Sequence, residues 1–265
     1  MNKELFKYEI KSNYNLFFIF IALLTMYITI INSMFNPELG SILNEMAESM
    51  PQFFALFGML NMGTSLVEFY ITYLYGFILI VIPLVFYFIL VNNLLAKHTD
   101  KQTLAYFLNT GYSRKQIIVN QIVILLISHL LITVYITGLM ILVGHLSYPS
   151  EVIVSDILQL NGYLFLLHLS LSSFALLCGS YFNDLKYSVG IPAVSIIFFV
   201  LLKMLTQVSD KISLIKYFNP LSLFNPNLVV SADLTYLVYA MLLLVISLSF
   251  LGLAIKIFVR KDLHL

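Results

Sequence analysis

Histidine is the residue type in this sequence that could carry proton or metal chemistry in apolar surroundings. Five occur, namely His98, His129, His145, His168 and His264. None has another His, Asp or Glu four residues away, the spacing at which one helix face presents two metal ligands. His129 and His168 lie within long apolar runs, where an ionisable residue is a functional hypothesis. They predict either a proton relay or neutral imidazoles hydrogen-bonded to a nearby serine, such as Ser128 or Ser170.

The residue sets that support nucleophilic, nucleotide or disulfide chemistry do not occur in the sequence. There is no Gly-x-x-x-x-Gly-Lys-Ser/Thr loop for phosphates, no Gly-x-Ser-x-Gly turn, no Glu-Glu pair and no His-x-x-x-His pair. The one cysteine, Cys178, excludes an internal disulfide and a cysteine-based zinc site. We therefore expect no catalytic, metal-binding or cofactor-binding residues in this chain, and we expect that it is not an enzyme.

The composition of the 265-residue chain indicates what surrounds it. Hydrophobic residues make up 60% and charged residues 10%, and the mean hydropathy is +0.95. Because soluble proteins carry about 25% charged residues, most of this surface must face lipid. The net charge of +1 provides no basic stripe for phosphates, which argues against a nucleic acid partner.

Several apolar stretches are long enough to cross a bilayer as helices, which takes about 20 residues. They occupy about residues 15–35, 69–92, 116–144, 158–182, 188–206 and 235–258. No small-residue cleavage site interrupts the first stretch, so we expect a retained span and not a signal peptide. The predicted fold class is an all-α membrane protein with six transmembrane helices, whose residues 1–265 form a single transmembrane domain.

The positions of the basic residues predict the orientation of the chain. With the N-terminus inside, every Lys and Arg except Lys203, Lys211 and Lys216 falls on the cytoplasmic side. Most acidic residues fall on the opposite side. Positively charged segments stay in the cytoplasm, so we expect a multi-pass protein of the cell membrane with both termini cytoplasmic.

Short helices are expected outside the spans. Residues 1–14 combine apolar and lysine positions typical of an interfacial helix, although a disordered basic tail has the same composition. Residues 41–50 and 51–58 predict two helices on the outer membrane surface. In the third outer loop, Asn219-Pro220 and Asn225-Pro226 predict helical fragments broken at each asparagine. Ala175 and Gly179 favour close approach of another helix, within the chain or in a dimer.

The inner loop at 93–116 contains two consecutive helix starts. Thr99 to Gln102 form one capping box, and the helix that it opens is expected to stop at Gly111. Ser113 to Gln116 form a second capping box, which opens the third span. The short helix carries Leu104, Phe107 and Leu108 on one face. That face could dock into a groove of a soluble partner, or it could lie back on the membrane surface.

Several short motifs resemble the permease subunit of bacterial type-2 ABC exporters. They are Met50-Pro51-Gln52-Phe53-Phe54-Ala55-Leu56-Phe57-Gly58, Glu68-Phe69-Tyr70, Asp100-Lys101-Gln102-Thr103-Leu104 and Asn109-Thr110-Gly111-Tyr112-Ser113-Arg114-Lys115-Gln116. The ending Arg260-Lys261-Asp262-Leu263 is also similar to endings common in that family. The six-span layout matches over nearly the whole chain. Two departures occur, because the usual acidic pair is His98-Thr99-Asp100 and the glycine of the Gly-Thr-Leu element is Gln102.

The resemblance implies that the loop at 99–116 is a coupling helix seated in a groove of a separate ATPase subunit. Two permease chains, identical or homologous, and two ATPase chains would form the exporter, with ATP and Mg bound in the ATPase partner. The residues implied in contacts with the ATPase are Asp100, Gln102, Thr103, Leu104, Phe107, Leu108, Gly111, Tyr112, Ser113 and Arg114.

Other function classes predict features that the sequence lacks. An ion-coupled secondary transporter would place Asp, Glu or Arg at mid-membrane, but all of these lie at span ends or in loops. An intramembrane enzyme would need a nucleophile with its base on facing spans. A membrane sensor or assembly subunit that does not transport remains an alternative. Because the spans lack fixed charges, the expected cargo is amphipathic or hydrophobic, such as a peptide, lipid or drug.

Overall fold

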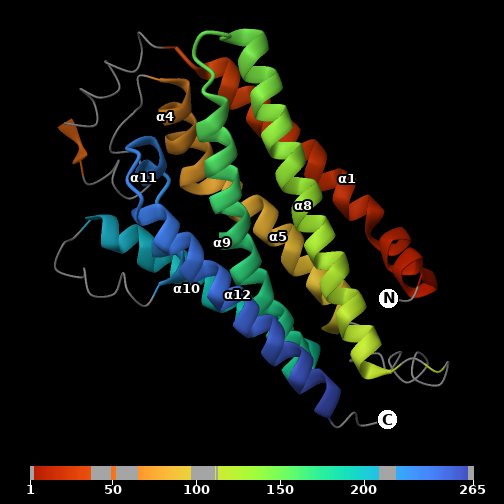
Figure 1. The fold of residues 1–265 in the computed structure, drawn as a ribbon. Coiled ribbons are helices and arrows are strands. Elements are labelled where there is room, and N and C mark those ends of the chain that lie inside the picture. The colour runs from red at the N-terminus through yellow and green to blue at the C-terminus, as the bar shows by residue number, and fades with distance from the viewer. Residues whose placement is uncertain are drawn as a thin grey trace.

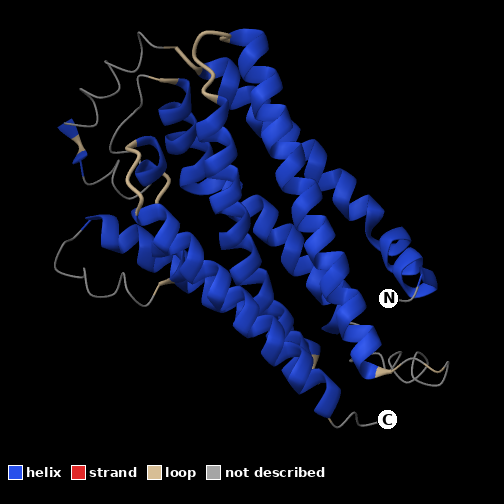
Figure 2. Cartoon of the chain, viewed as in Figure 1, coloured by secondary structure: helices blue, strands red, loops and turns tan. Residues whose placement is uncertain are grey.

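The computed structural model describes residues 3–36, 49–51, 65–96, 111, 113–208 and 219–261. These residues form helices and connecting turns, with no strand among them (Figure 2). Six helical segments are long and apolar enough to cross a membrane, namely Glu4–Met34, Leu66–Leu95, Arg114–Ser147, Val154–Tyr181, Leu185–Thr206 and Thr235–Arg260. The predicted all-helical fold, with six helices able to cross a membrane by their length and composition, is confirmed, and it indicates a multi-pass membrane protein. The outer helices predicted at 41–50 and 51–58 lie outside the described residues, apart from positions 49–51.

The first helix, α1 (Lys3–Met34), is longer than the predicted span. The sequence analysis divides this region into an interfacial helix at 1–14 and a span at 15–35, whereas the structure has one continuous helix of 32 residues. The physical reason is that no Gly or Pro interrupts residues 3–34. Asn13, near the expected boundary, donates its side-chain amide to the carbonyl of Glu9 at 2.9 Å without breaking the helix.

The second span combines α-helical and π-helical turns. It consists of α4 (Leu66–Tyr70), the π-helix η1 (Ile71–Ile78), α5 (Leu79–Val91) and the π-helix η2 (Asn92–Ala96). Ser65 and Glu68 form a capping box at its start, so Glu68 lies in the first turn, where the helix dipole favours an acidic side chain. Pro83 lies inside α5 and removes one backbone donor from the helix.

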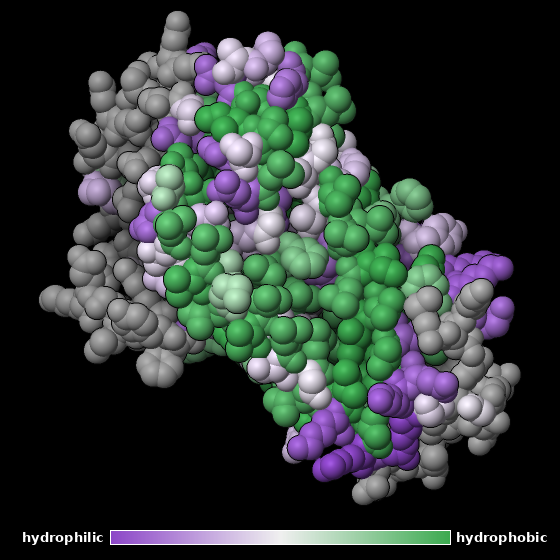
Figure 3. Space-filling view, in the orientation of Figure 1, coloured by the Kyte–Doolittle hydropathy of each residue, from purple (hydrophilic) through white to green (hydrophobic). Residues whose placement is uncertain are grey.

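The remaining long helices are α8 (Arg114–Ser147), α9 (Val154–Tyr181), α10 (Leu185–Val208) and α12 (Thr235–Arg260). Helix α9 forms the centre of the bundle, with contacts to α5, α8, α10 and α12, and α1 packs against α8 (Figure 1). In its most apolar stretch α9 is 72% buried, whereas α10 is 17% buried. Helix α9 therefore supplies most of the core, and α10 presents most of its apolar side chains to the surroundings. A hydrophobic surface covers the middle of the bundle, and hydrophilic residues gather at its lower end (Figure 3).

Small residues explain how neighbouring helices approach α9 closely. Ala175 is buried, and a Cβ added to Gly179 would lie 3.5 Å from the Cβ of Leu95 in η2. Both positions of the predicted small-residue pair therefore face neighbours within the chain. Packing within the chain, the first of the two predicted roles, is present at both positions.

Two asparagines organise the segment between α10 and α12. The side-chain oxygen of Asn219 accepts from the Leu221 amide at 3.0 Å and caps the 3₁₀ helix η4 (Pro220–Leu223). The Asn225 side chain accepts from the Asn227 amide at 3.2 Å and precedes α11 (Asn227–Val230). The predicted breaks at Asn219 and Asn225 are confirmed.

Candidate functional site

The loop that carries most of the predicted partner contacts lies largely outside the described residues. Gly111, Ser113 and Arg114 are described, and the first capping box at 99–102 is not. The predicted contacts that lie outside are Asp100, Gln102, Thr103, Leu104, Phe107, Leu108 and Tyr112. The structure therefore defines the base of the loop, where the chain enters α8.

The base of the loop is a glycine turn followed by a capped helix. Gly111 has a φ of +88°, a left-handed conformation that glycine adopts without a steric penalty. The Ser113 hydroxyl accepts from the Gln116 amide at 3.2 Å, and the Gln116 side chain accepts from the Ser113 amide at 3.0 Å. The second predicted capping box is thus confirmed. The cap fixes the direction in which α8 leaves the loop.

A chain of hydrogen bonds ties this base to two other helices at the same end of the bundle. Arg114 donates from Nη1 to the carbonyl of Lys261, and Lys261 donates from Nζ to the carbonyl of Phe182 at 2.6 Å. Burial lowers the pKa of the Lys261 ammonium to about 8. The start of α8, the end of α12 and the end of α9 are consequently held together beside the loop.

Buried amide side chains connect α1 to both helices that flank the loop. Asn93 of η2 donates to the side-chain oxygen of Asn13 at 2.9 Å. Gln121 of α8 donates to the Glu9 carboxylate at 3.2 Å. Glu9 is only 1% exposed, which is rare for a carboxylate. The hydrogen bond from Gln121 therefore offsets part of the cost of burying this carboxylate. The inner end of α1 is therefore linked to the chain on both sides of the loop.

The sequence analysis did not single out this amide cluster. A usable signal was present, because Asn92, Asn93, Asn120 and Gln121 interrupt apolar runs close to the ends of two spans. Both side-chain polar atoms of Asn120 are buried without a hydrogen-bond partner among the described residues. Buried amides without hydrogen bonds are uncommon. This region therefore contains more polar side-chain atoms than the hydrogen bonds among the described residues satisfy.

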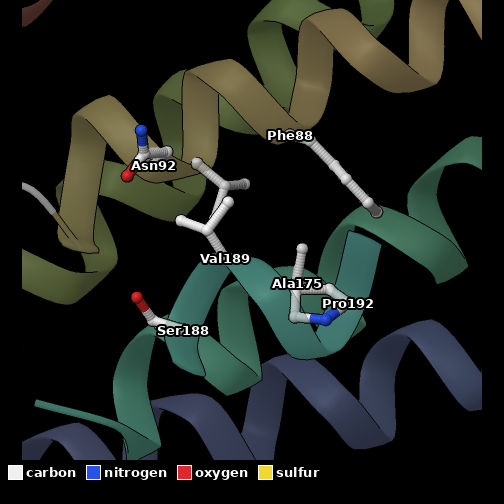
Figure 4. A pocket seen from close by; sticks show the side chains of 8 residues that line it. Phe88, Asn92, Ala175, Ser188, Val189 and Pro192 are labelled. Atoms are coloured by element: carbon white, nitrogen blue, oxygen red, sulfur yellow. The ribbon is translucent and has the colours of Figure 1, made fainter. Parts of the chain in front are cut away.

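Next to this cluster, a small cavity lies between the end of α5 with η2, α9 and α10. Asn92 and Phe88 line it from one side, Ser188, Val189 and Pro192 from another, and Ala175 closes it (Figure 4). Its volume of about 10 Å³ is close to that of a single water molecule. The cavity is therefore too small to hold a transported molecule in this conformation.

The two intramembrane histidines have defined partners on other helices. His129 of α8 bonds from Nδ1 to the Leu125 carbonyl at 2.8 Å and from Nε2 to the Ser172 hydroxyl at 3.1 Å. Its ring stacks on Tyr87 of α5, with ring centroids 3.6 Å apart and planes at 5°. Because a carbonyl only accepts, Nδ1 carries a proton, and a neutral imidazole then accepts from Ser172 at Nε2.

A serine was predicted to bond each of the two histidines. This prediction is confirmed for His129, although with a different serine, and it is wrong for His168. The serine is Ser172 of α9, not Ser128 or Ser170. His168 bonds from Nε2 to the Ile80 carbonyl at 3.1 Å, in the turn of α5 that Pro83 interrupts. Pro83 has no amide hydrogen for the carbonyl four residues earlier, that of Leu79, so this turn has one helical hydrogen bond fewer. The His168 ring adds a polar contact from a neighbouring helix at the adjacent Ile80 carbonyl.

No group of three or more His, Cys, Asp or Glu among the described residues could hold a metal ion. A layer of hydrogen-bonded polar side chains lies at the end of the bundle opposite the loop base. Lys203 of α10 donates to the Phe224 carbonyl at 3.4 Å, and Asn219 donates to the Phe199 carbonyl at 2.8 Å. Tyr163 of α9 donates to the Leu223 carbonyl. These contacts anchor the segment 219–225 over the start of α9 and the end of α10.

Comparisons with known proteins give no relative of this chain. No family model, no curated protein and no solved structure matches it.

Proposed function

We infer that the chain is the membrane-spanning permease subunit of an ATP-driven type-2 ABC exporter. The support comes from the short motifs around the inner loop, the six apolar helices and the hydrogen-bonded base of that loop. In this proposal the loop at 99–116 seats in a groove of a separate ATPase subunit. The ATPase binds ATP and Mg, and a second permease chain, identical or homologous, completes the translocation path.

The observation that carries the proposal is the connection of the loop base to the bundle. Arg114 and Lys261 join the base to α12 and, through Phe182, to α9. The Asn93–Asn13 and Gln121–Glu9 bonds join both sides of the loop to α1. Closure of two ATPase subunits around ATP would therefore displace the inner ends of several helices together. Such rigid-body motion about an interface is a standard form of conformational switching.

The proposed orientation places the loop and both termini in the cytoplasm of a cell with this chain in its cell membrane. Helix α1 begins and α12 ends at the same end of the bundle, which is also where the inner loop attaches (Figure 1). Lys3, Lys7, Lys11, Lys115, Lys186, Lys256, Arg260 and Lys261 belong to this end. Their concentration supports a cytoplasmic location.

The proposed cargo is amphipathic or hydrophobic, such as a peptide, a lipid or a drug. The two histidines in the middle of the spans, His129 and His168, are buried and hydrogen-bonded within the chain. A hydrophilic cargo such as a sugar would need polar groups along its path. Stimulation of the complex's ATPase activity by sugars, and not by hydrophobic peptides or drugs, would contradict this part of the proposal.

Purification of the tagged chain from native membranes in mild detergent tests the proposed function. We expect a soluble ATPase with a phosphate-binding loop to co-purify at one copy per permease. Its absence, while the chain itself stays folded and monodisperse, would favour a sensor or a secondary transporter instead.

A further inference from the structure

A groove with a basic rim lies at the inner end of the bundle, between the end of α9 and the last turns of α12. It is open to the surroundings. The residues that line it are Tyr181, Leu253, Lys256, Ile257, Arg260 and Lys261. Two of these are aliphatic, Leu253 and Ile257, and three are basic, of which Arg260 and Lys261 lie at the helix end. In Figure 3 hydrophilic residues gather at this end, below the hydrophobic surface of the bundle.

Helical spacing separates the groove into an apolar part and a charged part. Leu253 and Ile257 are four residues apart on α12, as are Lys256 and Arg260. Residues at this spacing lie one above the other on a helix, so each pair forms a short continuous strip. The aliphatic strip begins at Leu253, about one helical turn further from the end of α12 than Lys256, where the basic strip begins.

The positive charge of the groove is not balanced by the described residues. The side chains of Lys256 and Arg260 are exposed, and neither forms a hydrogen bond or ion pair within the described part of the chain. The Lys261 ammonium donates to the Phe182 carbonyl at 2.6 Å, an uncharged acceptor. A favourable interaction with the α12 dipole accounts for Arg260 in the last turn, but it does not account for Lys256 or for the hollow beside it.

We propose that this groove binds an anionic phospholipid, with the headgroup phosphate between Lys256 and Arg260 and an acyl chain along Leu253 and Ile257. Basic pockets between helices on the cytoplasmic side suit anionic headgroups, and phosphate oxygens accept charge-assisted hydrogen bonds from both cation types. The positive charges of Lys256 and Arg260 attract the phosphate. Contact of the acyl chain with Leu253 and Ile257 favours a lipid over free phosphate. The proposal uses the orientation proposed above and does not depend on an ATPase partner.

Native mass spectrometry of the full chain in detergent tests the site, with added phosphatidylglycerol or phosphatidylcholine. The wild-type chain is expected to retain phosphatidylglycerol and to release phosphatidylcholine. The double variant Lys256→Gln and Arg260→Gln is expected to lose phosphatidylglycerol affinity by roughly fivefold for each removed charge. Both side chains are exposed, so a monodisperse elution profile is expected for the variant.

The matched control is the double variant Lys7→Gln and Lys11→Gln, which removes the same charge from exposed positions of α1 outside the groove. Its phosphatidylglycerol retention is expected to stay within about twofold of the wild type. General attraction of lysines to a membrane needs an anionic lipid surface, which a neutral detergent micelle does not provide. Equal losses in the two double variants, or equal retention of the two lipids, would overturn the proposal. Displacement of the lipid by an equimolar amount of inorganic phosphate would also overturn it, since it would identify a phosphate site and not a lipid site.

Because the lipid measurement uses the isolated chain, its result is independent of the co-purification of an ATPase. A chain that lacks an ATPase partner but binds phosphatidylglycerol through Lys256 and Arg260 would refute the proposed function alone. A chain that binds the ATPase but shows no lipid preference would refute the lipid site alone.

Discussion

Phe107→Asp is expected to reduce the amount of ATPase that co-purifies with this chain by at least about 30-fold, and to abolish ATP-driven transport. In the proposed docking mode Phe107 and Leu104 are the apolar anchors of the coupling helix. Truncation of a central anchor typically weakens an interface by about 2 kcal/mol or more. A carboxylate at this position would in addition be buried without a partner, which raises the penalty. The measurement is the ratio of ATPase to permease after affinity purification, together with transport in vesicles.

The membrane part of the Phe107→Asp variant is expected to stay folded, because position 107 lies outside the spans. Ser231→Asp is a suitable control, since Ser231 is exposed in the segment between α11 and α12 and also acquires a negative charge. Its ATPase ratio and its transport are expected to match those of the wild type. Unchanged assembly and transport in the Phe107→Asp variant would remove this residue from the interface.

His129→Ala is expected to destabilise the bundle by about 2–4 kcal/mol, the typical effect of a cavity in a core together with lost buried hydrogen bonds. The variant loses the stacking on Tyr87 and the bond to Ser172, and it leaves the Ser172 hydroxyl with one partner fewer. A chain of this size shows a shift of roughly 2–4 °C in melting temperature for each kcal/mol. The measurement is thermal unfolding of the purified chain in detergent.

His145→Ala provides the control for this prediction. His145 belongs to the same helix and makes the same type of contact to a carbonyl four residues earlier, at 3.2 Å, but it is exposed. Its melting temperature is expected to stay within about 1 °C of the wild type. If His129 were instead part of a proton relay, His129→Ala would abolish transport and leave the melting temperature unchanged, and the structural role assigned to it would be wrong.

Local sequence signals predicted the spans and the helix starts well. Hydropathy identified all six candidate spans because each helix contains an uninterrupted apolar run about as long as the bilayer is thick. The cap at Ser113 and the breaks at Asn219 and Asn225 were predictable because the hydrogen bonds involved join residues two or three positions apart. The boundary between an interfacial helix and the first span was not, since nothing in residues 3–34 breaks the helix.

Contacts between distant residues were not predictable in the same way. The Asn93–Asn13 and Arg114–Lys261 bonds join residues far apart in the sequence, and no local spacing indicates such pairs. His168 was expected to bond a serine, but it bonds instead to the Ile80 carbonyl of α5, in the turn that leads to Pro83. The π-helical turns of η1 and η2 also have no sequence signature of their own, because packing determines where an extra residue enters a turn.

The most direct test of the central claim is photo-cross-linking from the inner loop in native membranes. Phe107 is replaced with p-benzoylphenylalanine, and Leu234, which is exposed at the opposite end of the bundle, is replaced with the same amino acid in a control chain. We expect a cross-link from position 107 to a protein with an ATP-binding phosphate loop, and no such adduct from position 234. This result would place the loop in the cytoplasm and against the ATPase. The absence of an ATPase adduct at position 107, in a chain that is folded and inserted in the membrane, would contradict the account.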